Sequence, residues 1–401
     1  MIVGAAARYL HWRLASQDEF LQTLLTRVKM VFTTGLGPHV STDRMSISLI
    51  GRLPAGPLDL IGDVHGEMQA LADLLAVLGY DAQGHHPRGR TLVFVGDLCD
   101  RGPDSPAVVD WVRRACQAGT AVAVMGNHEL NLLRGQRKDG NDWLHGNLST
   151  DGQRYLPMRM LAEGKAAEVL AFFDTLPIAL ERPDLRVVHA AWHTPSIARL
   201  RGLHGVPSAE FRRLEVAFRS DPDNQRLALA AGEERGPWRA QLLDARASLP
   251  NLPQVARWDA LRQMGNPIRV LTSGVEHPQG DPFFAGGQWR FVQRASWWDS
   301  YLDPVPVVVG HYWRRFVPPG APAVQRQGHD MFADVPSRRW HGACGQVFCV
   351  DFSVGGRFLE RQHGRDRQFD GRLAALRWPE RSLFFDDGSS CPTEAYGGMR
   401  L

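Results

Sequence analysis

Residues 58–79 read LDLIGDVHGEMQALADLLAVLG. The short, largely apolar run Leu58–Ile61 stops at Gly62-Asp63, which predicts a buried strand followed by a polar loop. From Met68 to Leu78 the apolar residues recur at helical spacing, and Gly79 is placed to end the helix. A strand, a polar loop and a helix in this order are typical of an α/β protein.

The same pattern recurs along the chain, because further apolar runs each stop at a cluster of Gly, Asp, Asn or His. The strands predicted in this way are Thr91–Val95, Ala121–Met125, Arg186–Val188, Val307–Val309 and Gln346–Val350. A helix is predicted from Pro106 to Ala118, with Ser105 as its cap. Largely buried strands that alternate with helices predict an α/β fold.

The length and composition are those of an ordinary soluble globular protein. The chain has 401 residues, of which 44% are hydrophobic and 22% charged, so one large domain with insertions and two domains are both open. The net charge of +3 gives no support for a nucleic-acid or membrane partner, although it is compatible with a small anionic substrate. The sequence leaves the oligomeric state open.

The cysteines and the apolar segments favour a cytoplasmic protein. Five scattered cysteines form no CxxC pair, which indicates neither a disulfide framework nor a zinc ribbon. No run of about 18 apolar residues is present, which excludes an ordinary transmembrane helix. The first apolar stretch contains Arg8, His11 and Arg13, unlike a secretory signal.

Metal-binding residue types follow the predicted strands. The candidate ligands are Asp63, His65, Asp97, Asn127, His189 and His311. Because ligands bind at the carboxyl edge of an α/β sheet, we expect these side chains to converge there. Taken alone, Asp63-x-His65 is more often a capped turn and Gly126-Asn127 an ordinary turn, so the prediction rests on the whole set. Oxygen and nitrogen ligands without a thiolate suit manganese, iron or zinc.

Five motifs occur in a fixed order along the chain. They are Asp63-Val64-His65, Gly96-Asp97-Leu98-Cys99-Asp100-Arg101-Gly102, Gly126-Asn127-His128-Glu129, His189 and Gly310-His311. This order resembles the signature of the calcineurin-like metallophosphoesterases, over residues 58–190 and 305–355. The intact Asp100-Arg101-Gly102 places the resemblance nearest the phosphoprotein phosphatases and their bacterial relatives, which include diadenosine tetraphosphate hydrolases.

The resemblance implies a fold and a role for each motif residue. The implied fold is a four-layer αββα sandwich of two mixed β-sheets flanked by helices. The implied ligands are Asp63 and His65 for one ion, Asp97 for both ions, and Asn127, His189 and His311 for the other. His128 would be the general acid, Asp100 would orient its imidazole, and Arg101 would bind phosphoryl oxygens. A hydroxide bridging two divalent ions would attack the phosphorus. Manganese is the first choice of metal, with iron, zinc, nickel and cobalt as alternatives.

Three segments fall outside the resemblance. We interpret residues 1–44 as a poorly determined N-terminal extension, compatible with a natural start near Met45. Residues 45–360 are predicted to form the catalytic domain, and 361–401 a C-terminal tail. An insertion or cap is expected at about 195–300, helical over 197–250 and built of loops and short strands over 265–300.

Two further features bear on the substrate. Trp192 and the pair Tyr312-Trp313 stand where the family commonly has small residues, so aromatic rings are expected near the pocket. A further phosphate-binding arginine is expected from the insertion. The candidates are Arg239, Arg257, Arg290 and Arg294.

The resemblance predicts a phosphoric ester hydrolase, first of all a phosphomonoesterase acting on a phosphoprotein or a small phosphorylated molecule. A dinucleoside polyphosphate hydrolase is the alternative, because the aromatic-rich insertion could stack a nucleobase. A nucleic-acid phosphodiesterase and a non-catalytic metal-binding interaction module are further alternatives. The dispersed charge argues against a nucleic-acid phosphodiesterase. The intact His128 and Asp100 argue against an interaction module without activity.

Overall fold

The computed structural model describes residues 47–138, 140–149, 151–317, 331–332 and 335–395. The predicted N-terminal extension over residues 1–44, with the proposed start at Met45, lies outside the described residues.

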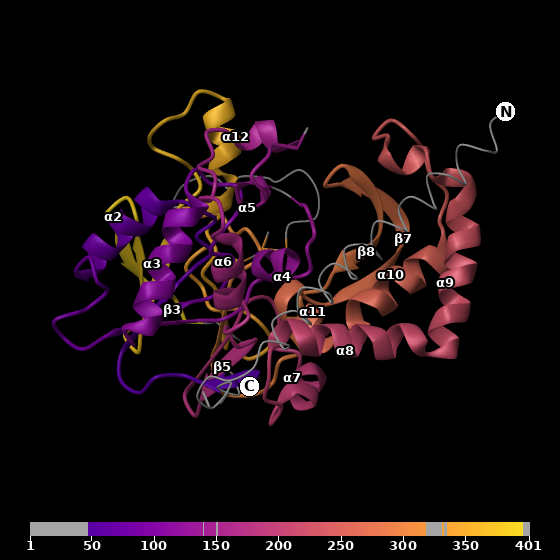
Figure 1. Ribbon diagram of the computed structural model, residues 1–401. Helices are drawn as coiled ribbons and strands as arrows, with labels where there is room; N and C mark the ends of the chain where they lie inside the picture. Colours follow the sequence, from indigo (N-terminus) through magenta and orange to yellow (C-terminus); the bar gives the residue numbers. More distant parts are fainter. Residues whose placement is uncertain (1–46, 139, 150, 318–330, 333–334, 396–401) are drawn as a thin grey trace, which may run out of the picture. The chain divides into compact units, whose positions relative to one another are not determined.

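Two mixed β-sheets form the centre of the fold (Figure 1). In strand order, the five-stranded sheet contains β1 (Ile50–Arg52), β5 (Ala179–Arg182), β6 (Leu185–Val188), β9 (Val307–Val309) and β10 (Val347–Cys349). The six-stranded sheet contains β13 (Ser390–Pro392), β12 (Ser382–Phe385), β11 (Ala374–Trp378), β2 (Leu58–Ile61), β3 (Thr91–Phe94) and β4 (Ala121–Ala123). Strands β2, β3 and β4 are parallel to one another, so their carboxyl ends meet at one edge.

One face of each sheet packs against the other sheet. Leu58, Leu60 and Val93 of the six-stranded sheet share a buried apolar cluster with Val187 and Val308 of the five-stranded sheet. The alternate residues of the same strands point the other way, as side chains of a strand must. They join a second cluster, whose other members come largely from the helices.

Helices cover the outer faces of the sheets. The helices are α2 (Met68–Leu78), α3 (Ser105–Gln117), α4 (Asn127–Leu133), α5 (Asp142–His145), α6 (Ala166–Phe173), α7 (Thr194–Leu200), α8 (Pro207–Ser220), α9 (Pro222–Arg235), α10 (Pro253–Gly265), α11 (Pro267–Ser273) and α12 (Arg357–Gln362). Leu71 and Leu74 of α2 and Val108 of α3 are buried in the same cluster as Ile61 and Phe94 of the six-stranded sheet. The predicted four-layer αββα sandwich is therefore confirmed. In the part of the chain that the structure describes, the helices are too short or too polar to cross a membrane.

The helix ends agree with the sequence with one correction. Helix α2 ends at Gly79, whose φ of 88° is the left-handed conformation that glycine adopts without strain. The cap of α3 is Asp104 and not Ser105, because the Asp104 carboxylate accepts a hydrogen bond from the Ala107 N–H at 3.0 Å. The Ser105 hydroxyl instead accepts from the Asp100 N–H at 2.9 Å.

The segment that we interpreted as an insertion folds as α7 to α11 followed by the hairpin β7 (Glu276–Ala285) and β8 (Gln288–Arg294). The helices extend further than the predicted residue 250, since Pro253 and Pro267 begin α10 and α11 as first-turn prolines. Val255 of α10, Ala231 of α9 and Phe291 of β8 share a small buried cluster. Figure 1 shows α8, α9 and α10 grouped with this hairpin.

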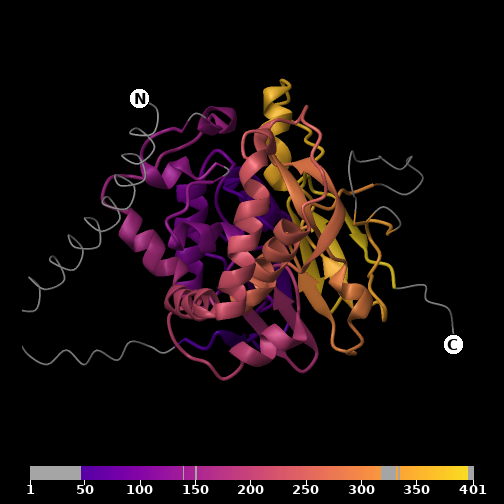
Figure 2. The same ribbon diagram turned by 90° about the vertical axis from the view of Figure 1, so that its right-hand side faces the viewer.

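The predicted C-terminal tail is wrong as a description of residues 374–392, which form β11, β12 and β13. Strand β11 pairs antiparallel with β2, with Ala375 opposite Ile61, and can be followed in yellow beside the indigo strands in Figure 2. Its residues Ala374, Ala375 and Leu376 are fully buried. The strands are short and separated by tight turns, so they contain too few residues for a periodic pattern that would predict them.

A buried ion-pair network joins the C-terminal strands to the rest of this sheet. The Asp59 carboxylate on β2 accepts hydrogen bonds from Arg90 Nε at 2.9 Å, Arg377 Nε at 2.8 Å and the Tyr80 hydroxyl at 2.9 Å. We expect Asp59→Ala to lower the free energy of unfolding by about 3–5 kcal/mol, because Arg90 would remain buried without this partner. Urea denaturation measures the change, with the exposed Asp73→Ala as control. A loss as small as that of the control would contradict the structural role of Asp59.

Candidate metal centre

The structure brings all six predicted ligands together at the strand ends. Asp63 and His65 follow β2, Asp97 follows β3, and Asn127 begins α4 directly after β4. His189 follows β6 and His311 follows β9 in the other sheet. Both sheets therefore contribute to one site. All of these residues are buried except Asn127, which is partly exposed.

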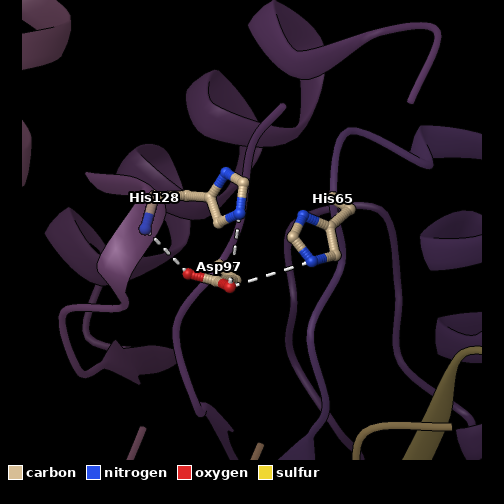
Figure 3. A group of neighbouring side chains, drawn as sticks. All are labelled: His65, Asp97 and His128. Atoms are coloured by element: carbon tan, nitrogen blue, oxygen red, sulfur yellow. Dashed lines mark hydrogen bonds and ion pairs between the residues drawn. The ribbon is translucent and has the colours of Figure 1, made fainter. Parts of the chain in front are cut away.

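Asp97 lies at the centre of the site. Its Oδ2 is 3.7 Å from His65 Nε2, 3.9 Å from His128 Nε2 and 3.3 Å from His189 Nε2. Figure 3 shows the rings of His65 and His128 both directed at this carboxylate. Asp97 belongs to two groups of potential ligands, one with His65 and His128 and one with His189 and His311. A carboxylate shared in this way can bind two ions at once.

Backbone groups fix the orientation of the ligand side chains. His65 Nδ1 donates to the Cys99 carbonyl at 3.0 Å, and His189 Nδ1 donates to the Val95 carbonyl at 2.8 Å. Each bond leaves the Nε2 atom of the ring facing the centre. The Asp63 carboxylate accepts the His311 N–H, at 3.2 and 3.1 Å from its two oxygens.

The donor set fits divalent metal ions. His311 Nε2 is buried and has no hydrogen-bond partner among the described residues, which is costly for a nitrogen atom that binds nothing. The Asn127 Oδ1 lies 3.2 Å from His189 Nε2, so an amide oxygen reaches the same place. Nitrogen and oxygen donors at this spacing, with no thiolate among them, are the ligands of manganese, iron and zinc sites.

Burial and neighbouring charges shift the pKa values of the predicted ligands in different directions. Burial would lower the pKa of His189, but the carboxylates of Asp97 and Asp63 raise it to about 10, and burial with Asp351 raises the pKa of Asp63 well above its ordinary value. Three other ligands have shifts towards the form that metal binding requires. Burial, with a contribution from Arg101, holds the pKa of His65 well below its ordinary value, and burial with Arg294 does the same for the pKa of His311. Burial alone would raise the pKa of Asp97, but the imidazoles of His189 and His128 bring it well below the usual range. Neutral imidazoles and an ionised carboxylate are the forms that coordinate metals.

The imidazole of His128 is held by Asp100, which the sequence predicted. Asp100 is in turn held by Trp143, which the sequence did not predict. The Nδ1 of His128 donates to Asp100 Oδ2 at 2.6 Å, as expected for an orienting carboxylate. The other oxygen of Asp100 accepts from the indole N–H of Trp143 at 2.6 Å. Trp143 is fully buried on α5, and no local motif marks it, because its contact with Asp100 spans 43 positions of the chain.

Arg101 lies at the edge of the site and is partly exposed. Its Nη1 is 3.5 Å from His65 Nε2, and its guanidinium carbon is 4.7 Å from the centre of the Trp313 ring. A cation over an aromatic face is stabilised by the ring's quadrupole, so Trp313 helps to position Arg101. The aromatic ring expected at Trp313 therefore does border the site, whereas Trp192 packs against Arg186.

Glu129 joins two of the ligand loops, a role that its sequence position did not reveal. Its carboxylate accepts hydrogen bonds from the backbone N–H groups of Asp97 at 3.0 Å, Leu98 at 2.8 Å and Gly126 at 2.9 Å. The Glu129 side chain is fully buried, and its carboxylate binds these backbone groups and does not occupy a ligand position. It supports the loop after β3 against the start of α4.

The backbone of the site is tightly packed and partly strained. A Cβ atom on Gly126 would lie 2.2 Å from Asp97 Oδ1, and one on Gly310 would lie 2.0 Å from Asp63 Oδ1. Only glycine fits at these two positions beside the ligands. Several non-glycine residues adopt a positive φ, a conformation that is concentrated at functional sites. These residues include His65, Asp97, Asp100, Arg101 and His311.

A cavity of about 730 Å³ opens beside the site and reaches into the insertion segment. Asn127 and His311 line it at the metal centre. Among the four arginines predicted as phosphate ligands, Arg239, Arg290 and Arg294 also line it, whereas Arg257, within the described residues, does not. The guanidinium carbon of Arg294 lies 6.0 Å from the centre of the Tyr312 ring, next to His311.

Comparisons with known proteins agree with this geometry. The chain is 39% identical over 121 residues to the asymmetrical bis(5'-nucleosyl)-tetraphosphatase PrpE of Halalkalibacterium halodurans, covering 29% of this chain and 48% of that protein. It is 30% identical over 146 residues to the protein of the same name from Bacillus subtilis, covering 35% and 60%. The chain thus spans about half the length of the curated relatives it matches.

A cold-active protein-tyrosine phosphatase from a psychrophilic Shewanella species is similar over 90% of this chain and 89% of its own, with 18% identity and a TM-score of 0.43. The family model for calcineurin-like phosphoesterases matches residues 56–221, which carry the first four of the five motifs. The resemblance predicted from the sequence is confirmed over residues 56–221, which match the model of the calcineurin-like phosphoesterases.

Proposed function

We propose that this protein is a metal-dependent hydrolase of phosphate esters with a two-metal centre. The observation that carries the proposal is the position of Asp97, whose Oδ2 lies 3.7 Å from His65 Nε2 and 3.3 Å from His189 Nε2. Asp63 and His65 would hold one ion, and Asn127, His189 and His311 the other, with Asp97 shared. When bound, the two ions, proposed to be manganese, would activate a water molecule and neutralise phosphoryl charge.

The chain's own side chains would bind the substrate and move a proton. Arg101 would bind the phosphoryl oxygens, for which its planar fork of N–H donors is suited. Because Nδ1 of His128 donates to Asp100, its Nε2 faces the centre and would give a proton to the leaving oxygen. Trp143 and Asp100 would keep that imidazole in place.

Two classes of substrate are compatible with this site. A phosphomonoester of a protein or small molecule would need no more than the residues already described. The names of the relatives favour a bis(5'-nucleosyl) tetraphosphate, and the cavity beside His311 provides space for a larger substrate. An interaction module without activity would have no need of the bond between His128 and Asp100.

An activity screen of the full chain tests the proposal. Manganese-loaded protein would be assayed with p-nitrophenyl phosphate, bis-p-nitrophenyl phosphate, a phosphopeptide and diadenosine tetraphosphate. We expect hydrolysis of at least one compound, and we expect a chelator to abolish it, because the ions supply the activated water. Metal-loaded protein that is no more active than metal-free protein on all four compounds would overturn the proposal.

A cytoplasmic setting is also proposed, since the five cysteines are all free in the structure. Fractionation of cells that express the tagged protein would test it, and recovery in an extracellular fraction would contradict it.

A further inference from the structure

The cavity beside the metal centre is lined mainly by positive charge; we call it the arginine chamber. Its walls come from α4, α8 to α11 and the hairpin, and its end at the centre is formed by Asn127 and His311. Nine cationic side chains line it against three carboxylates, Glu215, Asp259 and Glu276. The chain as a whole has a net charge of only +3, so this excess is local.

The carboxylates of the chamber are largely engaged. Glu215 pairs with Arg269 at 2.6 Å and with Arg219 at 3.1 Å. Asp259 pairs with Arg235 at 3.0 Å, while Arg262 lies 3.9 Å away from it. Two acids thus serve four arginines, and Glu276 is the one further carboxylate among the described residues that lines the cavity, so positive charge is in excess there.

The excess of positive charge in the chamber is clearest at Arg134. Its guanidinium is half-buried at the end of α4 and lies 4.6 Å from the centre of the Phe211 ring, on which Arg269 also lies at 5.2 Å. Burial, together with the charges of Arg269 and Arg262, lowers the pKa of Arg134 to about 10. None of the ion pairs in the described part of the chain includes Arg134.

A purely structural account explains only part of this arrangement. Arg219 binds Glu215 through its Nε, and its side chain is 68% exposed, so its ion pair leaves further N–H donors accessible to an anion. Arg269 is 11% exposed and Arg134 is half-buried, and both line the same cavity beside the Phe211 ring. Cations placed together in a partly dry site repel one another, and an anion bound between them would relieve the repulsion.

We propose that the arginine chamber binds an anionic group of the substrate beyond the phosphoryl group that is hydrolysed, so that preferred substrates carry a chain of two or more phosphates. This inference rests on the proposed function, because the chamber matters to catalysis only through its shared wall at Asn127 and His311. Asn127 and Arg134 are about 10 Å apart along helix α4, so the cavity extends from the centre along this helix and provides room for a second anionic group. Arginine forks match phosphate oxygens, which favours phosphate as the second group.

Binding of inorganic tripolyphosphate and of orthophosphate to the full-length, manganese-loaded chain tests the inference without turnover. Isothermal calorimetry would compare the wild type with the double variant Arg134→Gln/Arg219→Gln. We expect the double variant to bind tripolyphosphate at least about tenfold more weakly, since two charge-assisted contacts are lost. Its affinity for orthophosphate, which needs only the centre, should stay within about twofold of the wild type.

Arg213→Gln is the matched control, because Arg213 lies on α8 like Arg219, is 63% exposed and does not line the chamber among the described residues. Chelation of manganese by tripolyphosphate affects every variant alike, so the difference between variants reports on the chamber. Equal weakening of both anions, or no weakening of tripolyphosphate, would overturn the inference. Competition by a single-stranded oligonucleotide as strong as that by tripolyphosphate would also overturn it, since the chamber would then be a nucleic-acid groove.

These results are independent of the activity screen. If the chain hydrolysed none of the four compounds but bound tripolyphosphate through Arg134 and Arg219, the proposed function would fail and the anion site would stand. If the chain hydrolysed p-nitrophenyl phosphate and the double variant bound tripolyphosphate normally, the proposed function would stand and the anion site would fail.

Discussion

Asp97→Asn should lower kcat/KM for any phosphate ester that the wild type hydrolyses by about a thousandfold or more, and should reduce the bound metal. Asparagine keeps the size of the side chain but loses the negative charge that faces His65 and His189. Preorganised charge of this kind commonly contributes about a hundred- to a thousandfold to the rate, and loss of metal adds to that. Steady-state kinetics and elemental analysis of the same preparation measure both effects.

Asp73→Asn is the control for this variant, since Asp73 is exposed on α2 and is not among the predicted ligands. Both proteins should have similar unfolding curves, which would show that the loss is local. A variant that kept two ions per chain would contradict the shared role of Asp97, even if its activity were low.

His128→Ala should reduce activity in a manner that depends on the leaving group. For phenyl phosphate, whose phenolate leaves poorly, we expect a loss of about a hundred- to ten-thousandfold, the usual contribution of a general acid. For p-nitrophenyl phosphate the loss should be much smaller, because p-nitrophenolate leaves without a proton. The ratio of kcat/KM for the two compounds in each variant gives the result.

Asp100→Asn should show the same dependence with a smaller amplitude, because the imidazole of His128 would keep a weaker partner at Nδ1. His85→Ala is a suitable control, since His85 is exposed on the loop after α2. Equal losses with both leaving groups would rule out proton donation by His128 and would favour a structural role for it.

The sequence predicted the parts of the site that depend on local order. Asp63, His65 and Asp97 were predictable because each follows a short apolar strand, and parallel neighbouring strands end at one edge of a sheet. His189 and His311 follow strands of the second sheet, so their convergence with Asp97 depends on how the two sheets pack. That His189 and His311 lie near Asp97 could be predicted only from the resemblance to a family.

The contacts that the sequence did not predict join residues far apart in the chain, or residues that belong to no characteristic motif. Trp143 supports Asp100 from α5, and an indole has no spacing rule that would connect it to a distant carboxylate. Glu129 lies in the first turn of α4, and its carboxylate joins the loop at Asp97 to that at Gly126, a contact for which the sequence has no signal. The arginine chamber could not be predicted either, because Arg134 and Arg269 meet only after the insertion folds against α4.

The pairing of β11 with β2 determines when the site can form during synthesis. Ala375 lies opposite Ile61, two residues before the ligand Asp63, and the Gly62 N–H donates to the Ala374 carbonyl. The ribosome therefore makes β11, a neighbour of the first ligand strand, long after it has made β2. Contacts so distant in sequence form late and slowly. A nascent chain would thus present Asp63 and His65 before the sheet that positions them is complete, and selective metal uptake would follow the synthesis and pairing of β11.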